Sequence, residues 1–411
     1  MKNFFESAKS FHEALVLAQS KVQPITESEE IPTVDALGRI LASEIVSPKD
    51  LPGFARSGMD GYAVRSMDIH GASIQHPIEL EVIGRAEMGR DPVSLPKLES
   101  SQAMEIGTGG PLPPGADAIV ILEETERVSD SCVKIFSNVS TGTHVIVPDE
   151  DFKKHEQVYW PGQRIRPVDI GALLALGYTR VNVFRRLKVG VISTGDELVP
   201  AETQPKPGQI REINSHILKA QLTELGAQAQ LYGIVRDDRA VLLKTVRRAL
   251  GETDFVLLSG GSSVGAKDLT EQVLEELGQI YIHGLHMKPG KPTIFAICSD
   301  KPVVGLPGNP VSSAVVFAKF VVPLIMKRSG ASMSLASRRE RGTLRQEIKS
   351  VLGRTDFVPI VLRLEGETAQ IERVKGHTTN ISTLAKASGL LYIAPDSEGH
   401  LSGDDVWFEV W

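Results

Sequence analysis

The chain has little cysteine. Cys132 and Cys298 are its two cysteines in 411 residues, and neither belongs to a Cys-x-x-Cys pair. A disulfide framework or a structural zinc site needs more thiols at closer spacing. The sequence therefore indicates a reducing compartment, and we expect a cytoplasmic protein.

Charge of one sign and long apolar runs are also absent. The formal net charge of −6 gives no overall reason to expect nucleic acid or an acidic membrane as a partner. Glu6 and Glu13 interrupt the first residues, so no signal peptide is predicted. The most apolar helical pattern, residues 311–326, contains Lys319 and Pro323 and predicts a buried helix rather than a membrane span.

The chain has enough apolar residues for several domains. A length of 411 residues with 41% hydrophobic residues corresponds to about two to four domains. Proline and glycine recur among short apolar runs at residues 51–149, which predicts strands, whereas strands and helices alternate from Leu187 and predict a parallel sheet. Beyond Ser329 the pattern is β again. Helices are predicted at residues 4–22 and 33–41.

These patterns predict a multidomain α/β fold in five segments. The linking segments flank the β-rich block, which is why we interpret that block as an insertion. The segments are an N-terminal helix docking on the α/β domain (1–27), a small linking α+β domain (28–50 and 151–178), an inserted β-rich domain (51–150), a parallel-sheet α/β domain (179–328) and a C-terminal β domain (329–411).

Residues 254–268 carry the strongest single signal. The apolar run 255–258 predicts a buried strand, residues 259–263 form a Ser-Gly-Gly-Ser-Ser loop, and a helical pattern follows. Backbone N–H groups in this arrangement can close around an anion, usually a phosphate. The spacing matches neither the P-loop nor Gly-x-Gly-x-x-Gly, and a tight structural turn gives the same pattern.

Polar, glycine-containing or acidic loops follow four of the predicted parallel strands. Ligands of parallel sheets bind beyond the carboxyl ends of the strands, so we expect these loops to share one rim. Asn214 is predicted to cap one helix, and Asn309 another that begins at Pro310. The loops are residues 193–198, 236–238, 259–268 and 305–310.

The predicted rim carries both carboxylates and lysines. Glu197, Asp237 and Asp268 offer the oxygen ligands that Mg²⁺ prefers. Lys288 and Lys291 bracket a Pro-Gly turn that would hold both ammonium groups near one point. Together they fit phosphoryl or nucleotidyl chemistry, although each charge alone is more often a solvated surface charge.

Two loops of the β-rich block carry further polar groups. Asp60 precedes Gly61, and Asp-Gly is a common turn pair, so a turn former and a functional carboxylate are equally good interpretations. Thr108 lies in a rigid loop of glycine and proline, where a structural role is the simpler interpretation. His283 and His286 are interpreted as strand residues rather than ligands.

Eight different short motifs are spread along nearly the whole chain. They are residues 57–63, 107–111, 193–198, 236–238, 259–265, 288–292, 305–310 and 353–357. In this order they resemble the molybdopterin molybdenumtransferase family, to which bacterial MoeA and the E domain of gephyrin belong. Singly several of these motifs are weak, but jointly they are very specific.

The resemblance implies a fold and an activity. The fold is a four-domain subunit with a MoaB/Mog-like α/β domain, forming a homodimer in which this domain faces the C-terminal domain of the other subunit. The activity is insertion of molybdate into adenylated molybdopterin, with Mg²⁺ present and AMP released. Molybdopterin adenylyltransferase and molybdoenzyme maturation proteins are the partners that it implies.

The resemblance also implies roles for residues. Glu197, Asp237 and Asp268 would position the metal and the adenylate, and Lys288 and Lys291 would neutralise molybdate and phosphate oxygens. The pterin and AMP would be cradled by Gly260, Gly261, Ser262, Ser263, Pro307, Gly308, Asn309 and Pro310. Asp60, Thr108, Arg354 and Thr378 would complete the site from other domains, some of them across the dimer.

Departures and alternatives remain open. Gly284 stands where the family often has a lysine, and Thr378 where many members have a serine. One alternative is a gephyrin-like scaffold without catalysis. Another is a molybdopterin adenylyltransferase or nucleotide pyrophosphatase that uses the α/β domain alone. The sequence does not separate molybdate from tungstate.

Overall fold

The computed structural model describes residues 8–260, 266–332, 338–365 and 368–411, without the side chains of residues 266–268, 365 and 368. The chain divides into two compact units. Unit 1 comprises Met1–Ser43, Pro161–Gly171 and Thr179–Trp411, and unit 2 comprises Glu44–Trp160 and Ala172–Tyr178. Each unit has hydrophobic cores of its own.

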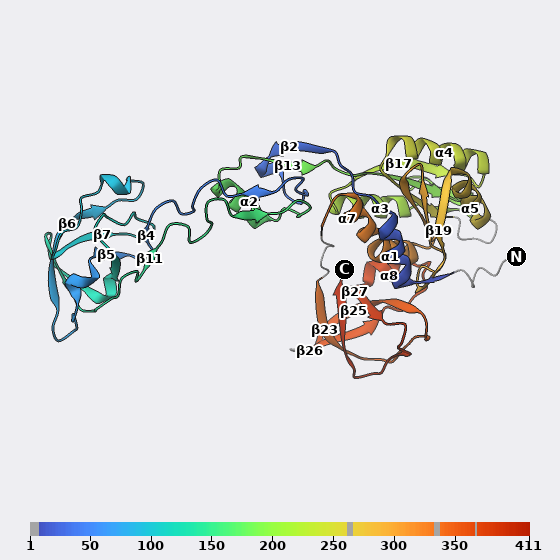
Figure 1. Ribbon diagram of the computed structural model, residues 1–411. Coiled ribbons are helices and arrows are strands. Elements are labelled where there is room, and N and C mark those ends of the chain that lie inside the picture. The colour runs from blue at the N-terminus through green and yellow to red at the C-terminus, as the bar shows by residue number, and fades with distance from the viewer. Residues whose placement is uncertain (1–7, 261–265, 333–337, 366–367) are drawn as a thin grey trace. The chain divides into compact units, whose positions relative to one another are not determined.

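A six-stranded sheet forms the centre of unit 1 (Figure 1). Its strands, in spatial order, are β17 (Gln228–Val235), β14 (Lys188–Thr194), β18 (Phe255–Gly260), β22 (Lys301–Leu306), β21 (Ile294–Cys298) and β19 (Gly278–His283). The first four pair in parallel, which confirms the predicted parallel sheet. Strand β21 runs antiparallel to both of its neighbours, β22 and β19. Ser299 and Asp300, both with positive φ, close the two-residue hairpin between β21 and β22.

Helices cover both faces of this sheet. One face packs against α4 (Arg239–Glu252) and α5 (Ala266–Leu277). The other packs against α1 (Phe11–Lys21), α3 (Asn214–Glu224), α6 (Pro310–Val316), the π-helical segment η5 (Phe317–Val321) and α7 (Val322–Arg328). Residues of β18 therefore alternate between two apolar cores and are nearly all buried, which explains the unbroken apolar run in the sequence.

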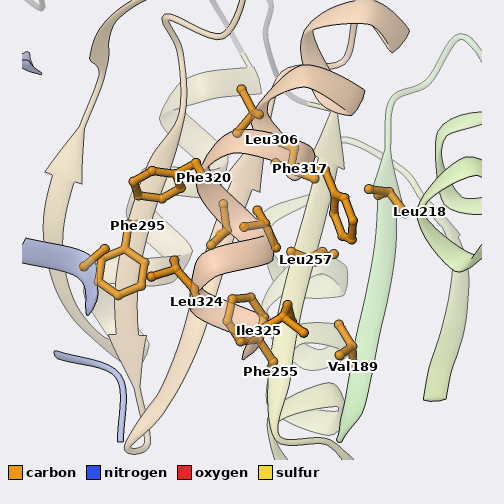
Figure 2. Packing of buried hydrophobic residues seen from close by; sticks show 14 of the residues in the cluster. Val189, Leu218, Phe255, Leu257, Phe295, Leu306, Phe317, Phe320, Leu324 and Ile325 are labelled. Carbon is orange, nitrogen blue, oxygen red and sulfur yellow. The ribbon is translucent and has the colours of Figure 1, made fainter. Parts of the chain in front are cut away.

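Figure 2 shows the larger of these two cores. Phe255 and Leu257 of β18 lie against the aromatic rings and leucines of the helical stretch after β22, among them Phe317 and Leu324. In the part of the chain that the structure describes, Pro310–Arg328 is the one helix long and apolar enough to cross a membrane. Since 67% of its apolar window is buried, it is a core helix of unit 1.

The C-terminal part of unit 1 is a closed β-barrel that borrows a strand from the α/β part. Its strands are β25 (Thr355–Glu365), β26 (Thr368–Arg373), β23 (Arg339–Leu344), β29 (Asp405–Val410) and β27 (Gly389–Ile393), and β27 closes the ring by pairing with β25. Strand β20 (Leu285–Lys288) pairs in parallel with β25, and β1 (Lys9–Ser10) pairs with the other edge of β20. The two parts of unit 1 are therefore joined through a shared sheet.

Unit 2 is built on a second six-stranded sheet. Its strands, in spatial order, are β8 (Ala118–Ile121), β5 (Gly61–Val64), β7 (Gln102–Ile106), β6 (Ile78–Ala86), β10 (Cys132–Ile135) and β9 (Thr125–Ser129). At the root of unit 2 the chain enters through β3 (Ile45–Val46) and leaves through β12 (Gln157–Tyr159), which pair antiparallel. The helix α2 (Pro167–Ala175) spans a boundary between the units.

Two helix predictions need correction. The predicted helix at residues 33–41 is a short 3-10 turn, η1 (Thr33–Asp35), because Gly38 has a φ of +72° and Ile40 and Leu41 form β-bridges instead. The predicted helix at residues 4–22 is described from Phe11, where Ser10 and Glu13 form a reciprocal capping box. Its first residues, 4–7, lie outside the described part of the chain.

Candidate functional site

A cavity of about 330 Å³ lies at the carboxyl edge of the six-stranded sheet of unit 1. The loops after β14, β17 and β22 contribute to its wall, together with Ser259 and Gly260 at the end of β18, as expected at the carboxyl edge of a parallel sheet. Among the predicted site residues it brings together Glu197, Asp237, Gly260, Gly308, Asn309 and Pro310. The sequence assigned no site role to other wall residues, among them Ile210, Glu212, Ile213, Asn214 (predicted only as a helix cap), Thr379 and Ile381.

Glycine is required at the centre of this wall. Gly260 has a φ of +125°, and a Cβ atom there would lie 2.1 Å from the backbone oxygen of Thr194. This close approach follows from the parallel pairing of Thr194 with Gly260 at the ends of β14 and β18. The end of β18 therefore presents backbone rather than a side chain to the cavity.

The loops after β14 and β17 carry carboxylates. The backbone N–H of Asp237 donates to Oδ1 of Asp196 over 3.3 Å. Burial raises the pKa of Asp237 above its ordinary value, and the negative charges of Asp196 and Glu197 raise it further. A cation at this place would relieve that repulsion, and carboxylate oxygens are the kind of ligand that Mg²⁺ prefers.

The predicted metal set is only partly described. The side chain of Asp268 lies outside the described residues, as do Gly261, Ser262 and Ser263. Among the residues that are described, no three His, Cys, Asp or Glu side chains lie close enough together to hold a metal ion. Pro307 is buried behind the loop and is not part of the cavity wall.

Asn309 connects the α/β part to the C-terminal part of the same chain. It stands at the N-cap of α6 and Pro310 is the first helical residue, but the predicted side-chain cap is wrong. The amide Nδ2 of Asn309 instead donates to Oγ1 of Thr378 over 3.3 Å, and Val311 N donates to the Thr378 backbone oxygen over 3.2 Å. The Asn309 amide therefore binds the Thr378 hydroxyl instead of capping the N-terminus of α6.

A second, smaller cavity of about 60 Å³ lies beside this contact. Its wall includes Lys288, Thr378 and Asp356, and Lys288 is the register partner of Asp356 in the pairing of β20 with β25. The guanidinium of Arg354 forms two hydrogen bonds to the Asp356 carboxylate, of 2.6 and 2.9 Å. Because that side chain is only 4% exposed, the arginine is held firmly in place.

The turn between the two predicted lysines packs against α6. Gly290 has a φ of +118°, and a Cβ atom there would lie 2.4 Å from Cγ2 of Val316. Lys288 reaches the smaller cavity, whereas Lys291 is half-buried and lies outside both cavity walls. The structure therefore assigns the two lysines different surroundings.

Asp60 and Thr108 meet in unit 2. Both the backbone N–H and the hydroxyl of Thr108 donate to Oδ1 of Asp60, over 2.6 and 2.8 Å. These two hydrogen bonds lower the pKa of Asp60, and the positive charge of Arg85 lowers it further. Both residues are exposed, and the Thr108 donors favour the ionised form of Asp60.

An open α/β sheet with a polar cavity at its carboxyl edge defines a ligand-binding α/β protein. Family models cover most of the chain: the MoeA N-terminal region (domain I and II) matches residues 9–177, the probable molybdopterin binding domain residues 190–327, and the MoeA C-terminal region (domain IV) residues 341–411. The chain belongs to the MoeA family, several of whose curated members are named molybdopterin molybdenumtransferase.

Individual relatives agree with this assignment. The molybdopterin molybdenumtransferase of Nostoc is 33% identical over 94% of this chain and 89% of its own length. The Haemophilus influenzae protein of the same name is 35% identical over 81% of this chain and 80% of its own length. The crystal structure of a molybdopterin biosynthesis MoeA protein from Pyrococcus horikoshii matches with a TM-score of 0.84, 32% identity, and coverage of 98% of this chain and 100% of that one.

These matches confirm the predicted fold class, family and enzyme type. By family the chain is a transferase of molybdenum cofactor biosynthesis. The roles predicted for single residues remain predictions.

Proposed function

We propose that the protein inserts molybdate into adenylated molybdopterin and releases AMP in a Mg²⁺-dependent reaction. The observation that supports this most directly is the pair of cavities on either side of the Asn309–Thr378 contact. The larger one offers carboxylates and glycine backbone, and the smaller one offers cations. An adenylated pterin and a metal oxyanion need these two environments next to each other.

The larger cavity would take the adenylated part of the substrate. Gly260 and Gly308 present backbone where a phosphate can approach closely, and Ile210, Ile213 and Ile381 offer apolar surface for a base. In the reaction the phosphoanhydride bond between the pterin phosphate and AMP breaks. One water molecule supplies the oxygen and protons that complete the two separate phosphate groups. AMP then leaves from the same cavity.

Glu197 and Asp237, together with Asp268, would hold Mg²⁺. Bound there, the ion would neutralise phosphate charge as the bond breaks. The raised pKa of Asp237 supports this, because a carboxylate crowded by Asp196 and Glu197 gains stability from a nearby cation.

The smaller cavity would take the oxyanion. Lys288 lines it, and Arg354 is fixed beside it on the Asp356 carboxylate. Thr378 adds a hydroxyl group to its wall. In this proposal Lys291 acts on phosphate oxygens, and Asp60 and Thr108 complete the site from the partner subunit of a homodimer.

The test is an AMP-release assay on the purified protein. With adenylated molybdopterin and Mg²⁺, AMP should appear when molybdate is added and stay near background without it. A parallel reaction with tungstate would decide the preference between the two oxyanions. Failure to release AMP, or release that ignores both oxyanions, would overturn the proposal.

A pair of lysine variants sharpens this assay. Lys288→Ala should raise the molybdate concentration needed for half-maximal AMP release by about tenfold, since a charged partner is worth about 1.5–3 kcal/mol. Lys244→Ala, which removes the same charge from the exposed face of α4, should leave it unchanged. An equal effect of both variants would argue against an oxyanion role for Lys288.

A further inference from the structure

Asn214 joins three elements around the larger cavity. It is the first residue of α3, but its side chain makes no helix cap, which corrects the cap predicted from the sequence. Its Nδ2 donates to Oγ of Ser259 over 2.9 Å and to the backbone oxygen of Gly308 over 2.8 Å. Ser259 lies at the end of β18, and Gly308 lies in the loop after β22.

The hydrogen-bond partners determine which end of the Asn214 amide faces Gly308. The Gly308 oxygen can only accept a hydrogen bond, so the NH₂ group must face it. Oδ1 is then buried, and no described group donates to it. An unpaired buried amide oxygen is unfavourable, so the two donated bonds, rather than packing, explain why an amide suits this position.

The two bonds continue the sheet where its own ladder stops. Strands β18 and β22 pair in parallel, and their register ends at Ser259 with Leu306. Beyond that pair, Gly260 is the last residue of β18 and pairs with Thr194 of β14, whereas Gly308 lies in the loop after β22. The Asn214 amide links Ser259 of β18 to Gly308 of the loop after β22. It therefore sets the spacing of Gly260 and Gly308 on the cavity wall.

We propose that Asn214 is a positioning residue that holds Gly260, at the end of β18, and Gly308, in the loop after β22, at the spacing needed by the phosphate of the bound nucleotide. The inference rests on the proposed function, because it takes the larger cavity to be the adenylate site. Asn214 acts through Ser259 and Gly308 and supplies no chemistry of its own.

The test is AMP binding to the full chain, measured by calorimetry. Asn214→Ala should weaken binding about tenfold, since two donated bonds that preorganise the loops are lost. The control is Gln221→Ala, which removes another amide with a buried, unpaired oxygen from the same helix, but outside this cavity. It should leave AMP affinity unchanged, and both variants should melt within a few degrees of each other.

A second variant separates positioning from general stability. Asn214→Asp places a carboxylate against the Gly308 oxygen, so binding at about pH 8 should be weaker than in Asn214→Ala, by about tenfold. At about pH 5 the protonated acid can donate one hydrogen bond, and the ratio of its affinity to that of Asn214→Ala should rise above one. A purely structural role would not produce this reversal.

Each outcome is decisive. A wild-type protein that binds no AMP overturns the proposed function and this inference with it. A wild-type protein that binds AMP while Asn214→Ala binds it equally well overturns the inference alone. The same holds if Gln221→Ala weakens binding as much as Asn214→Ala does.

Discussion

Asp237 sits where its negative charge is disfavoured by its neighbours. Its pKa is raised by burial and by the charges of Asp196 and Glu197. A raised pKa of an acid means that the folded state binds the proton more tightly than the unfolded state does. The contribution of Asp237 to the free energy of unfolding therefore falls as pH rises through that raised value.

Asp237→Asn should consequently stabilise the protein while abolishing AMP release. Because the carboxylate is partly exposed, the gain is small, about 1–2 °C in Tm at about pH 8 and less at about pH 4.5. Thermal unfolding at the two pH values checks this, with Asp396→Asn as an exposed control that should not change Tm. A lower Tm for Asp237→Asn would contradict the argument.

Asp60 presents the opposite case. Its pKa is lowered, first by the Thr108 backbone N–H, then by the Thr108 hydroxyl and the charge of Arg85. The stabilisation of its ionised form is present above the ordinary pKa and is lost as pH falls through the lowered value. Asp60 therefore stays ionised under mildly acidic conditions.

Thr108→Val should move the pKa of Asp60 upward, because it removes the hydroxyl donor and keeps the backbone one. Thr108→Ser should leave it low. Carbon-detected NMR titration of labelled aspartates measures both values. Indistinguishable pKa values in the two variants would show that the hydroxyl has no part in holding the carboxylate.

At the scale of elements, sequence patterns predict those parts whose contacts are local or periodic. The strand at Phe255–Gly260 and the helix at Asn214–Glu224 follow from apolar periodicity, and the carboxyl rim follows from the parallel order. His283 and His286 lie in strands β19 and β20, as predicted. The pairing of β20 with β25 was not predicted, because it joins segments far apart in sequence. The role of Asn214 was missed for a related reason, since a helix-start asparagine looks like a cap until the neighbouring loops are placed.

The N-terminal helix stabilises the joint around β20. Phe11 packs edge-on against Phe357 at 5.2 Å between ring centroids, and β1 pairs with the edge of β20. Phe11→Ala should lower the free energy of unfolding by about 2 kcal/mol, since it removes an aromatic pair and leaves a partly filled space.

Urea unfolding measures this loss. Val16→Ala is the matched control, because Val16 lies on the same helix and is 53% exposed. It should cost only a few tenths of a kcal/mol. Equal losses in both variants would mean that the helix, rather than the Phe11–Phe357 contact, carries the effect.

At the scale of the whole molecule, the proposed homodimer has a consequence that mixing can test. If Asp60 of one subunit completes the site built around Asp237 of the other, neither Asp60→Ala nor Asp237→Ala is active alone. Co-refolding equal amounts should then restore about a quarter of the wild-type AMP release, because half of the dimers are mixed and each has one intact site. No recovery would place all the required residues in one chain. The five-segment domain division stays a prediction that limited proteolysis can examine.

Strands β3 and β12 bring together the two ends of the segment that forms most of unit 2. The backbone N–H of Ser47 donates to the Glu156 oxygen, and the Ser47 oxygen accepts from the His155 N–H. Ile45 is the register partner of Tyr159. Two strands side by side need only a short turn to join them. A short turn could therefore replace the segment between β3 and β12 while these two strands stay paired.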